Sequence, residues 1–165
     1  MLRIAALAGA LLGFGATAAL ANDPPYLKLA EQLGTPHLAD SVGPADKSRL
    51  LLHFTPDGED AANWTRLTTI SILKVQPADT DSALRSVTRQ LHDALKARHA
   101  TIEVFDQSPL SPLRCFFEFS AEGETDRGVV YSPDPGFVTV AQLALKDGTT
   151  LRRDDLRTLK SLIGE

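Results

Sequence analysis

The sequence lacks most of the residues and motifs that support catalysis, redox chemistry or metal binding. Its 165 residues include a single cysteine, Cys115, so an internal disulfide and a Cys-x-x-Cys zinc site are both excluded. There is no glycine-rich phosphate loop and no Gly-x-Ser-x-Gly motif that would present a nucleophilic serine. We therefore predict neither an enzyme nor a bound cofactor.

The sequence also has no excess of positive charge. It contains 17 lysines and arginines against 21 aspartates and glutamates, which gives a formal net charge of −4. A mildly acidic chain of this kind is not expected to bind nucleic acid or to adhere to an anionic membrane surface.

The first 21 residues have a composition of their own. Arg3 is followed by an apolar run from Ile4 to Leu20, and the first acidic residue is Asp23. The run ends in a small-x-small site, which is typical of a secretory signal peptide cleaved after Ala21. The alternative is a membrane anchor, since about 17–25 apolar residues can span a bilayer. No cationic stop follows the run, so we expect cleavage and no stable membrane insertion afterwards.

Cleavage would leave 144 of the 165 residues, and the loss of Arg3 would change the net charge from −4 to −5. This length is typical of one domain whose core is large enough to fold without disulfides or metal. Residues 22–48 are weakly patterned and are expected to form a lead-in segment, whereas residues 49–165 are expected to form the domain. We predict a location in the periplasm or outside the cell.

The hydrophobic pattern predicts several strands. Residues 66–75 alternate between two faces and are rich in β-branched side chains, which is typical of a strand. The other predicted strands are 49–54, 101–105, 113–119, 128–131 and 137–145. A turn is predicted at 122–126, and short turns between successive strands favour antiparallel pairing.

Two helices are predicted beside these strands. The first begins at Pro77–Asp81 and carries one apolar stripe, made of Leu84, Val87, Leu91, Ala94 and Leu95. The second covers Arg153–Ile163 and has its leucines on one face. The predicted fold class is therefore α+β, a mainly antiparallel sheet covered by two amphipathic helices.

The segment from His53 to Thr65 joins a strand, a Pro-Asp-Gly turn and the tripeptide Asn-Trp-Thr, and an alternating strand follows. This pattern resembles a group of uncharacterised exported bacterial proteins. With the order of elements, it makes residues 49–165 similar to the PsbP-like α/β/α sandwich. That fold is shared by the PsbP subunit of photosystem II, DcrB-type bacterial proteins and a Ran-binding nuclear import factor. The resemblance implies an accessory or binding protein, and it supplies no functional residue.

The first predicted helix carries a basic stripe beside its apolar one. Arg85, Arg89, His92 and Lys96 follow one another at spacings of four, three and four, so they share one helix flank. This basic stripe would suit an acidic partner segment or anionic headgroups. The alternative is a solvated flank whose long side chains cover the edge of the core.

Trp64 is the only tryptophan and is the second candidate for a partner contact. Tryptophan is enriched at binding hot spots, so an exposed ring after the Gly58 turn would be a suitable anchor. The alternative is a ring that closes the end of the core and donates its N–H to a carbonyl.

The remaining candidates favour structural roles. His92 and His99 are seven residues apart, too far to share a metal ion without other ligands, and no metal site is predicted. The acidic turn Asp57–Asp60 lacks the ligand spacing of a calcium loop and is expected to be solvated. Cys115 lies on the apolar face of its predicted strand, as a core residue would.

The sequence therefore favours a non-catalytic exported accessory or binding protein that contacts another envelope protein. We expect a monomer or a weak oligomer. One alternative is a small-ligand carrier with an apolar pocket between the sheet and the helices. The last is a hydrolase that uses His53 or Cys115.

Overall fold

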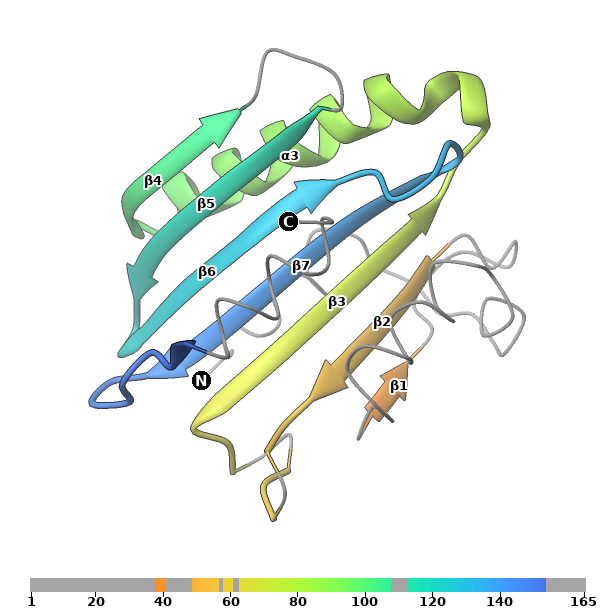
Figure 1. Cartoon of the computed structure of the whole chain (residues 1–165). Helices are drawn as coiled ribbons and strands as arrows, with labels where there is room; N and C mark the ends of the chain where they lie inside the picture. The colour runs from red at the N-terminus through yellow and green to blue at the C-terminus, as the bar shows by residue number, and fades with distance from the viewer. Residues whose placement is uncertain (1–37, 41–48, 57, 61–62, 108–112, 154–165) are drawn as a thin grey trace.

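The computed structural model is built on one sheet of seven antiparallel strands, and it describes residues 38–40, 49–56, 58–60, 63–107 and 113–153 (Figure 1). The strand order is β1-β2-β3-β7-β6-β5-β4, so β1 and β4 are the outermost strands of the described sheet. The strands are β1 Leu38–Asp40, β2 Arg49–Phe54, β3 Arg66–Lys74, β4 Thr101–Gln107, β5 Arg114–Ala121, β6 Glu124–Tyr131 and β7 Phe137–Lys146.

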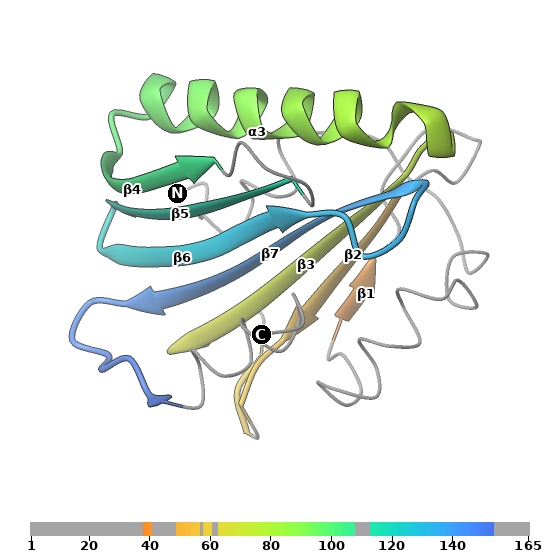
Figure 2. The ribbon, with the colours of Figure 1, turned by 45° about the horizontal axis from the view of Figure 1, so that its top comes forward.

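One face of the sheet carries the helix α3, Thr80–Ala97, which follows a 3-10 turn, η3, at Pro77–Asp79 (Figure 2). The Thr80 hydroxyl fixes the start of α3. It donates to the Pro77 carbonyl and accepts from the Gly136 amide, both at 2.8 Å, which ties the helix to the turn before β7. At the other end His99 adopts a left-handed φ of 56°, which ends the helix and turns the chain into β4.

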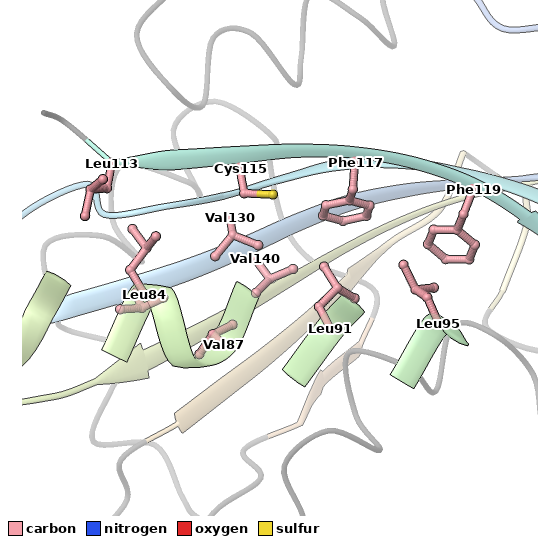
Figure 3. Packing of buried hydrophobic residues seen from close by; sticks show 11 residues of the cluster. Leu84, Val87, Leu91, Leu95, Leu113, Cys115, Phe117, Phe119, Val130 and Val140 are labelled. Carbon is pink, nitrogen blue, oxygen red and sulfur yellow. The ribbon is translucent and has the colours of Figure 1, made fainter. Parts of the chain in front are cut away.

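The predicted apolar stripe of α3 packs against β5, β6 and β7, as Figure 3 shows. The buried cluster consists of Leu84, Val87, Leu91, Leu95, Leu113, Cys115, Phe117, Phe119, Val130, Val138 and Val140. Successive side chains of a strand point to opposite faces, so every second residue of β5 from Cys115 to Phe119 faces the helix. Both the helix and the position of Cys115 in the core are confirmed.

The face of the sheet turned away from α3 is also apolar in its central strands. Ile70 of β3 pairs with Ala141 of β7, and Ala141 pairs with Val129 of β6. All three side chains are buried. The same cluster contains Leu52, Ile72 and Tyr131. The middle of the sheet is therefore buried on both sides, which explains the long runs of buried residues in β3 and β7.

Two predicted boundaries differ in the structure. β6 begins at Glu124, although its charged first residues suggested a turn over 122–126. Glu122 and Gly123 suffice for the turn, because both have positive φ and a two-residue loop of this kind follows the twist of the strands. At the N-terminal side, Leu38–Asp40 pairs with β2, so the sheet begins within the expected lead-in segment.

The fold is mixed α+β and consists mostly of sheet. In the described part of the chain α3 is the one α-helix with assigned bounds, where two helices were predicted. The second, Arg153–Ile163, lies outside the described residues except for Arg153. Within the same ranges no helix combines the length and the apolar character that crossing a membrane requires.

Candidate functional site

The basic stripe forms an exposed flank of α3. Arg85, Arg89 and Lys96 are exposed, and within the described residues none of the three makes an ion pair or a hydrogen bond. His92 lies between them and is half-buried. Residues three and four apart are neighbours on a helix surface, so the four side chains form one row beside the core leucines.

A hollow of about 270 Å³ lies between the basic stripe and β4. It is lined by Arg85, Thr88, Arg89, His92, Phe105 and Gln107. The rings of His92 and Phe105 are in contact, with centroids 4.7 Å apart and planes inclined by 54°. The hollow therefore combines two exposed guanidinium groups with an aromatic wall.

Thr88 is the buried polar group of this hollow. Its side chain is 3% exposed, and its Oγ1 has no hydrogen-bond partner within the described residues. A buried polar group without a partner costs on the order of 1–3 kcal/mol. The two exposed arginines of the hollow suit the oxygens of a carboxylate or another oxyanion.

Acidic side chains of α3 offset the basic stripe only in part. Asp93 is exposed beside His92, with His92 Nδ1 3.9 Å from its Oδ1, and Asp81 lies in the first turn. The three exposed cations of the stripe outnumber these two carboxylates. The flank is thus locally cationic on a chain whose net charge is −4.

β4 borders the hollow and is an edge of the sheet. Among the described strands it pairs with β5 alone, so its outer N–H and C=O groups face away from the sheet. Two large apolar side chains are exposed here, Val104 on β4 (42%) and Phe116 on β5 (36%). The exposure of these two side chains is not predictable from the sequence, because a local pattern does not show which strand is an edge.

Trp64 is not part of this surface. Its side chain is 1% exposed and packs with Leu67 and Ala144, while Lys146 Nζ lies 5.0 Å from the ring centroid. The burial agrees with a core role, although within the described part the ring Nε1 lacks the expected carbonyl partner. A buried ring offers no surface to a partner, so Trp64 drops out of the candidate contact.

The two residues of the hydrolase alternative lie far apart. His53 is on β2 and Cys115 on β5, four strand positions away, which corresponds to about 19 Å at the usual strand spacing. His53 Nδ1 instead lies 3.1 Å from Thr69 Oγ1. A nucleophile and its base must be within hydrogen-bond reach, so these two residues do not form such a pair.

Cys115 is expected to resist thiol reagents in the folded protein. It is fully buried, and burial, with a smaller contribution from the Asp106 charge, raises the pKa of its thiol from 9.0 to about 11. We expect iodoacetamide to label the native protein at pH 8 at least about 100-fold more slowly than the urea-unfolded protein, because the thiolate fraction falls by that factor. Labelling followed by mass spectrometry measures both rates, and similar rates would contradict the burial.

A buried carboxyl group that the sequence did not reveal lies on the α3 side of the sheet. Asp126 of β6 is fully buried, and Gln142 Nε2 donates to its Oδ1 at 2.6 Å. Burial raises the pKa of Asp126 from 3.8 to about 7; the Gln142 bond lowers it and the Glu124 charge raises it further. Perturbed carboxyls are common in active sites. This one has no surface open to solvent, so we assign it to the core.

The acidic turn before β3 is held by its own hydrogen bonds. Glu59 accepts bonds from the backbone N–H and the hydroxyl of Thr65, both at 2.7 Å, and these bonds lower the pKa of its carboxyl. Asp60 Oδ1 accepts a hydrogen bond from the backbone N–H of Asn63. Across the described residues, no group of His, Cys, Asp and Glu side chains is placed to hold a metal ion.

Two larger hollows, of about 410 Å³ each, lie near the start of α3. One is bordered by the turn at 132–135, and the other lies beside Lys74 and Phe137. Both are open to solvent. Between α3 and the sheet, the space that the carrier alternative requires is occupied by the core cluster (Figure 3).

A comparison with protein-family models gave no match to this chain, and a search of curated proteins gave none either. The resemblance to the PsbP-like sandwich stays a prediction.

Proposed function

We propose that this protein is an exported, non-catalytic accessory protein that contacts another envelope protein through the basic stripe of α3. The observation that carries the proposal is the row of exposed cations, Arg85, Arg89 and Lys96, without an ionic partner in the described chain. A solvated flank would also be exposed. The hollow beside the row, with its wall of His92 and Phe105, favours a binding site instead.

The proposed location rests on the N-terminal segment, whose composition is typical of a signal peptide cleaved after Ala21. Within the α+β class, we propose that the fold is the PsbP-like sandwich. The apolar cluster on the face away from α3 supports a layer on that side as well. The helix predicted from the sequence at Arg153–Ile163 is the candidate for that layer.

The chemistry of the basic stripe favours a partner rich in carboxylates. Arginine offers a planar fork of donors that matches a carboxylate, and such charge-assisted bonds are stronger than neutral ones. Because the cations are exposed, the contact is expected to weaken as the ionic strength rises.

Crosslinking in intact cells tests the proposal. The full chain is compared with a variant that removes three cations of the stripe, Arg85→Gln, Arg89→Gln and Lys96→Gln. A control variant removes three exposed cations elsewhere, Lys74→Gln, Arg152→Gln and Arg153→Gln. The two variants have the same net charge, so a difference between them reports the position of the charges.

We expect one dominant envelope partner whose crosslinked yield falls at least about tenfold in the stripe variant and stays within a factor of two in the control. An equal loss in both variants would mean a response to net charge alone. A yield unchanged in both would remove the stripe from the contact, and the absence of any partner would overturn the accessory role.

A further inference from the structure

We propose that the partner contributes an extended segment with acidic residues at alternate positions, and that this segment pairs with the outer edge of β4 beneath the basic stripe. The inference rests on the proposed function, because it specifies the chemistry and the conformation of the segment that the stripe would bind. Addition of a strand to an open sheet edge is a common mode of peptide recognition.

α3 and β4 place the cations along this edge. The chain reverses between Ala97 and Thr101, so β4 runs back alongside the helix that precedes it (Figure 2). Phe105 and Gln107 of β4 line the same hollow as Arg85 and Arg89. The exposed cations therefore lie beside the position that the next strand of the sheet would take.

The spacing of the cations fits an extended segment. At about 1.5 Å per residue, the steps from Arg85 to Arg89, His92 and Lys96 are about 6, 4.5 and 6 Å along the helix. Alternate residues of a strand repeat every 6.6 Å or so. The row spans about 16 Å, so it matches about five residues of strand with a carboxylate at every second position.

The sheet face opposite α3 indicates which residues of the added segment should alternate with the acidic ones. Val104 and Phe116 are exposed on the sheet face away from α3, and Arg114 Cζ lies 5.7 Å from the Phe116 ring centroid. Asp106 is exposed on that face too, so it disfavours acidic residues there. The added segment should alternate acidic residues toward α3 with apolar residues toward Val104 and Phe116.

β4 has only some of the features that normally protect an edge strand from pairing with another chain. A register shift between Ile102 and Val104 interrupts its pairing with β5. The Glu103 carboxylate accepts a hydrogen bond from Ser120 Oγ at 3.0 Å, which binds it back to β5. The stretch from Val104 to Gln107 then pairs in regular register, and it is the stretch beside the hollow.

Fluorescence anisotropy with the full chain and a labelled synthetic peptide tests this mode of binding. The probe is acetyl-Glu-Val-Glu-Val-Glu-Val-Glu. Three altered peptides separate the contributions of charge, spacing and backbone pairing: one with lysine for glutamate, one of the same composition with the glutamates consecutive, and one N-methylated on alternate backbone nitrogens. The binding of the probe to the stripe and control variants defined above is measured as well.

We expect the probe to bind, and each altered peptide and the stripe variant to reduce the affinity at least tenfold. The control variant should stay within twofold of the unchanged protein. Equal binding of the N-methylated probe would overturn strand addition, and equal binding of the consecutive-glutamate peptide would overturn the alternating pattern. Binding to vesicles of anionic lipid that is tighter than binding to the probe, and that is lost in the stripe variant, would assign the stripe to headgroups.

Sedimentation equilibrium tests whether a second copy of the chain occupies the edge. A dimer that dissociates in a Val104→Glu variant would overturn the proposal of a separate partner segment. The crosslinking experiment above distinguishes a failure of strand addition from a failure of the accessory role. A partner that depends on the stripe in cells, together with no peptide binding, would reject strand addition and leave the accessory role standing.

Discussion

Replacement of Gly128 by alanine is expected to destabilise the protein by about 3 kcal/mol or more. A Cβ at this position would lie 2.3 Å from Phe117 Cζ and 2.4 Å from the Ala141 carbonyl oxygen. Phe117 is buried under α3, and Ala141 lies in the central strand β7. Neither neighbour can move without disturbing the core, so the added methyl group must displace the sheet. Urea unfolding at neutral pH measures the effect.

Two variants show whether steric overlap is the cause. Gly58→Ala adds a methyl group where no atom from elsewhere in the described residues lies within 4 Å, although φ there is +84°, so it should cost only about 1 kcal/mol through backbone strain. Phe117→Leu removes the ring contact, and in the Gly128→Ala background it should restore about 1 kcal/mol beyond additivity. A Gly128→Ala protein within 1 kcal/mol of the unchanged chain would contradict the close approach.

The second large effect concerns pH and the buried Asp126. Its pKa in the folded state is about 7 against 3.8 when unperturbed. As the pH rises above about 4, the unfolded chain releases this proton first, so the free energy of unfolding falls until about pH 7 and is level above it. The whole change amounts to roughly 4 kcal/mol. Asp126→Asn should abolish this dependence of the free energy of unfolding on pH, because an amide does not ionise. The amide oxygen can still accept the hydrogen bond from Gln142.

Urea unfolding of both proteins from pH 4 to pH 8 tests this expectation. The unchanged chain should lose stability over that range, and Asp126→Asn should lose roughly 4 kcal/mol less. Asp93→Asn is a matched control, because that carboxyl group is exposed on α3. Parallel curves for the unchanged chain and Asp126→Asn would show that Asp126 does not govern the pH dependence.

Local patterns were sufficient to predict most elements of this fold. The alternation of β3 and the three- and four-residue spacing of Leu84, Leu91 and Leu95 arise from single elements, so the sequence carries them directly. The basic stripe is predictable from the sequence for the same reason. Its four residues belong to one helix, and helix geometry alone puts them on one flank.

Features that depend on strand order were not predictable in this way. The edge position of β4 follows from pairings between distant segments, and so does the exposure of Val104 and Phe116. The predicted turn over 122–126 includes Asp126, yet this residue lies in β6, between β5 and β7, and is buried. Trp64 shows the same limit, since the contact that buries it includes Ala144 of β7.

The place of β7 in the sheet constrains the order in which the fold can be completed. β7 is the last described strand along the chain, yet it lies in the middle of the sheet, between β3 and β6. Until Phe137–Lys146 is available, the β1-β2-β3 part and the β4-β5-β6 part share no strand pairing, and β3 has an open edge. Such non-local closure is typical of slow folding. A nascent chain that ends before β7 would therefore lack every strand pairing that joins the two parts of the described sheet.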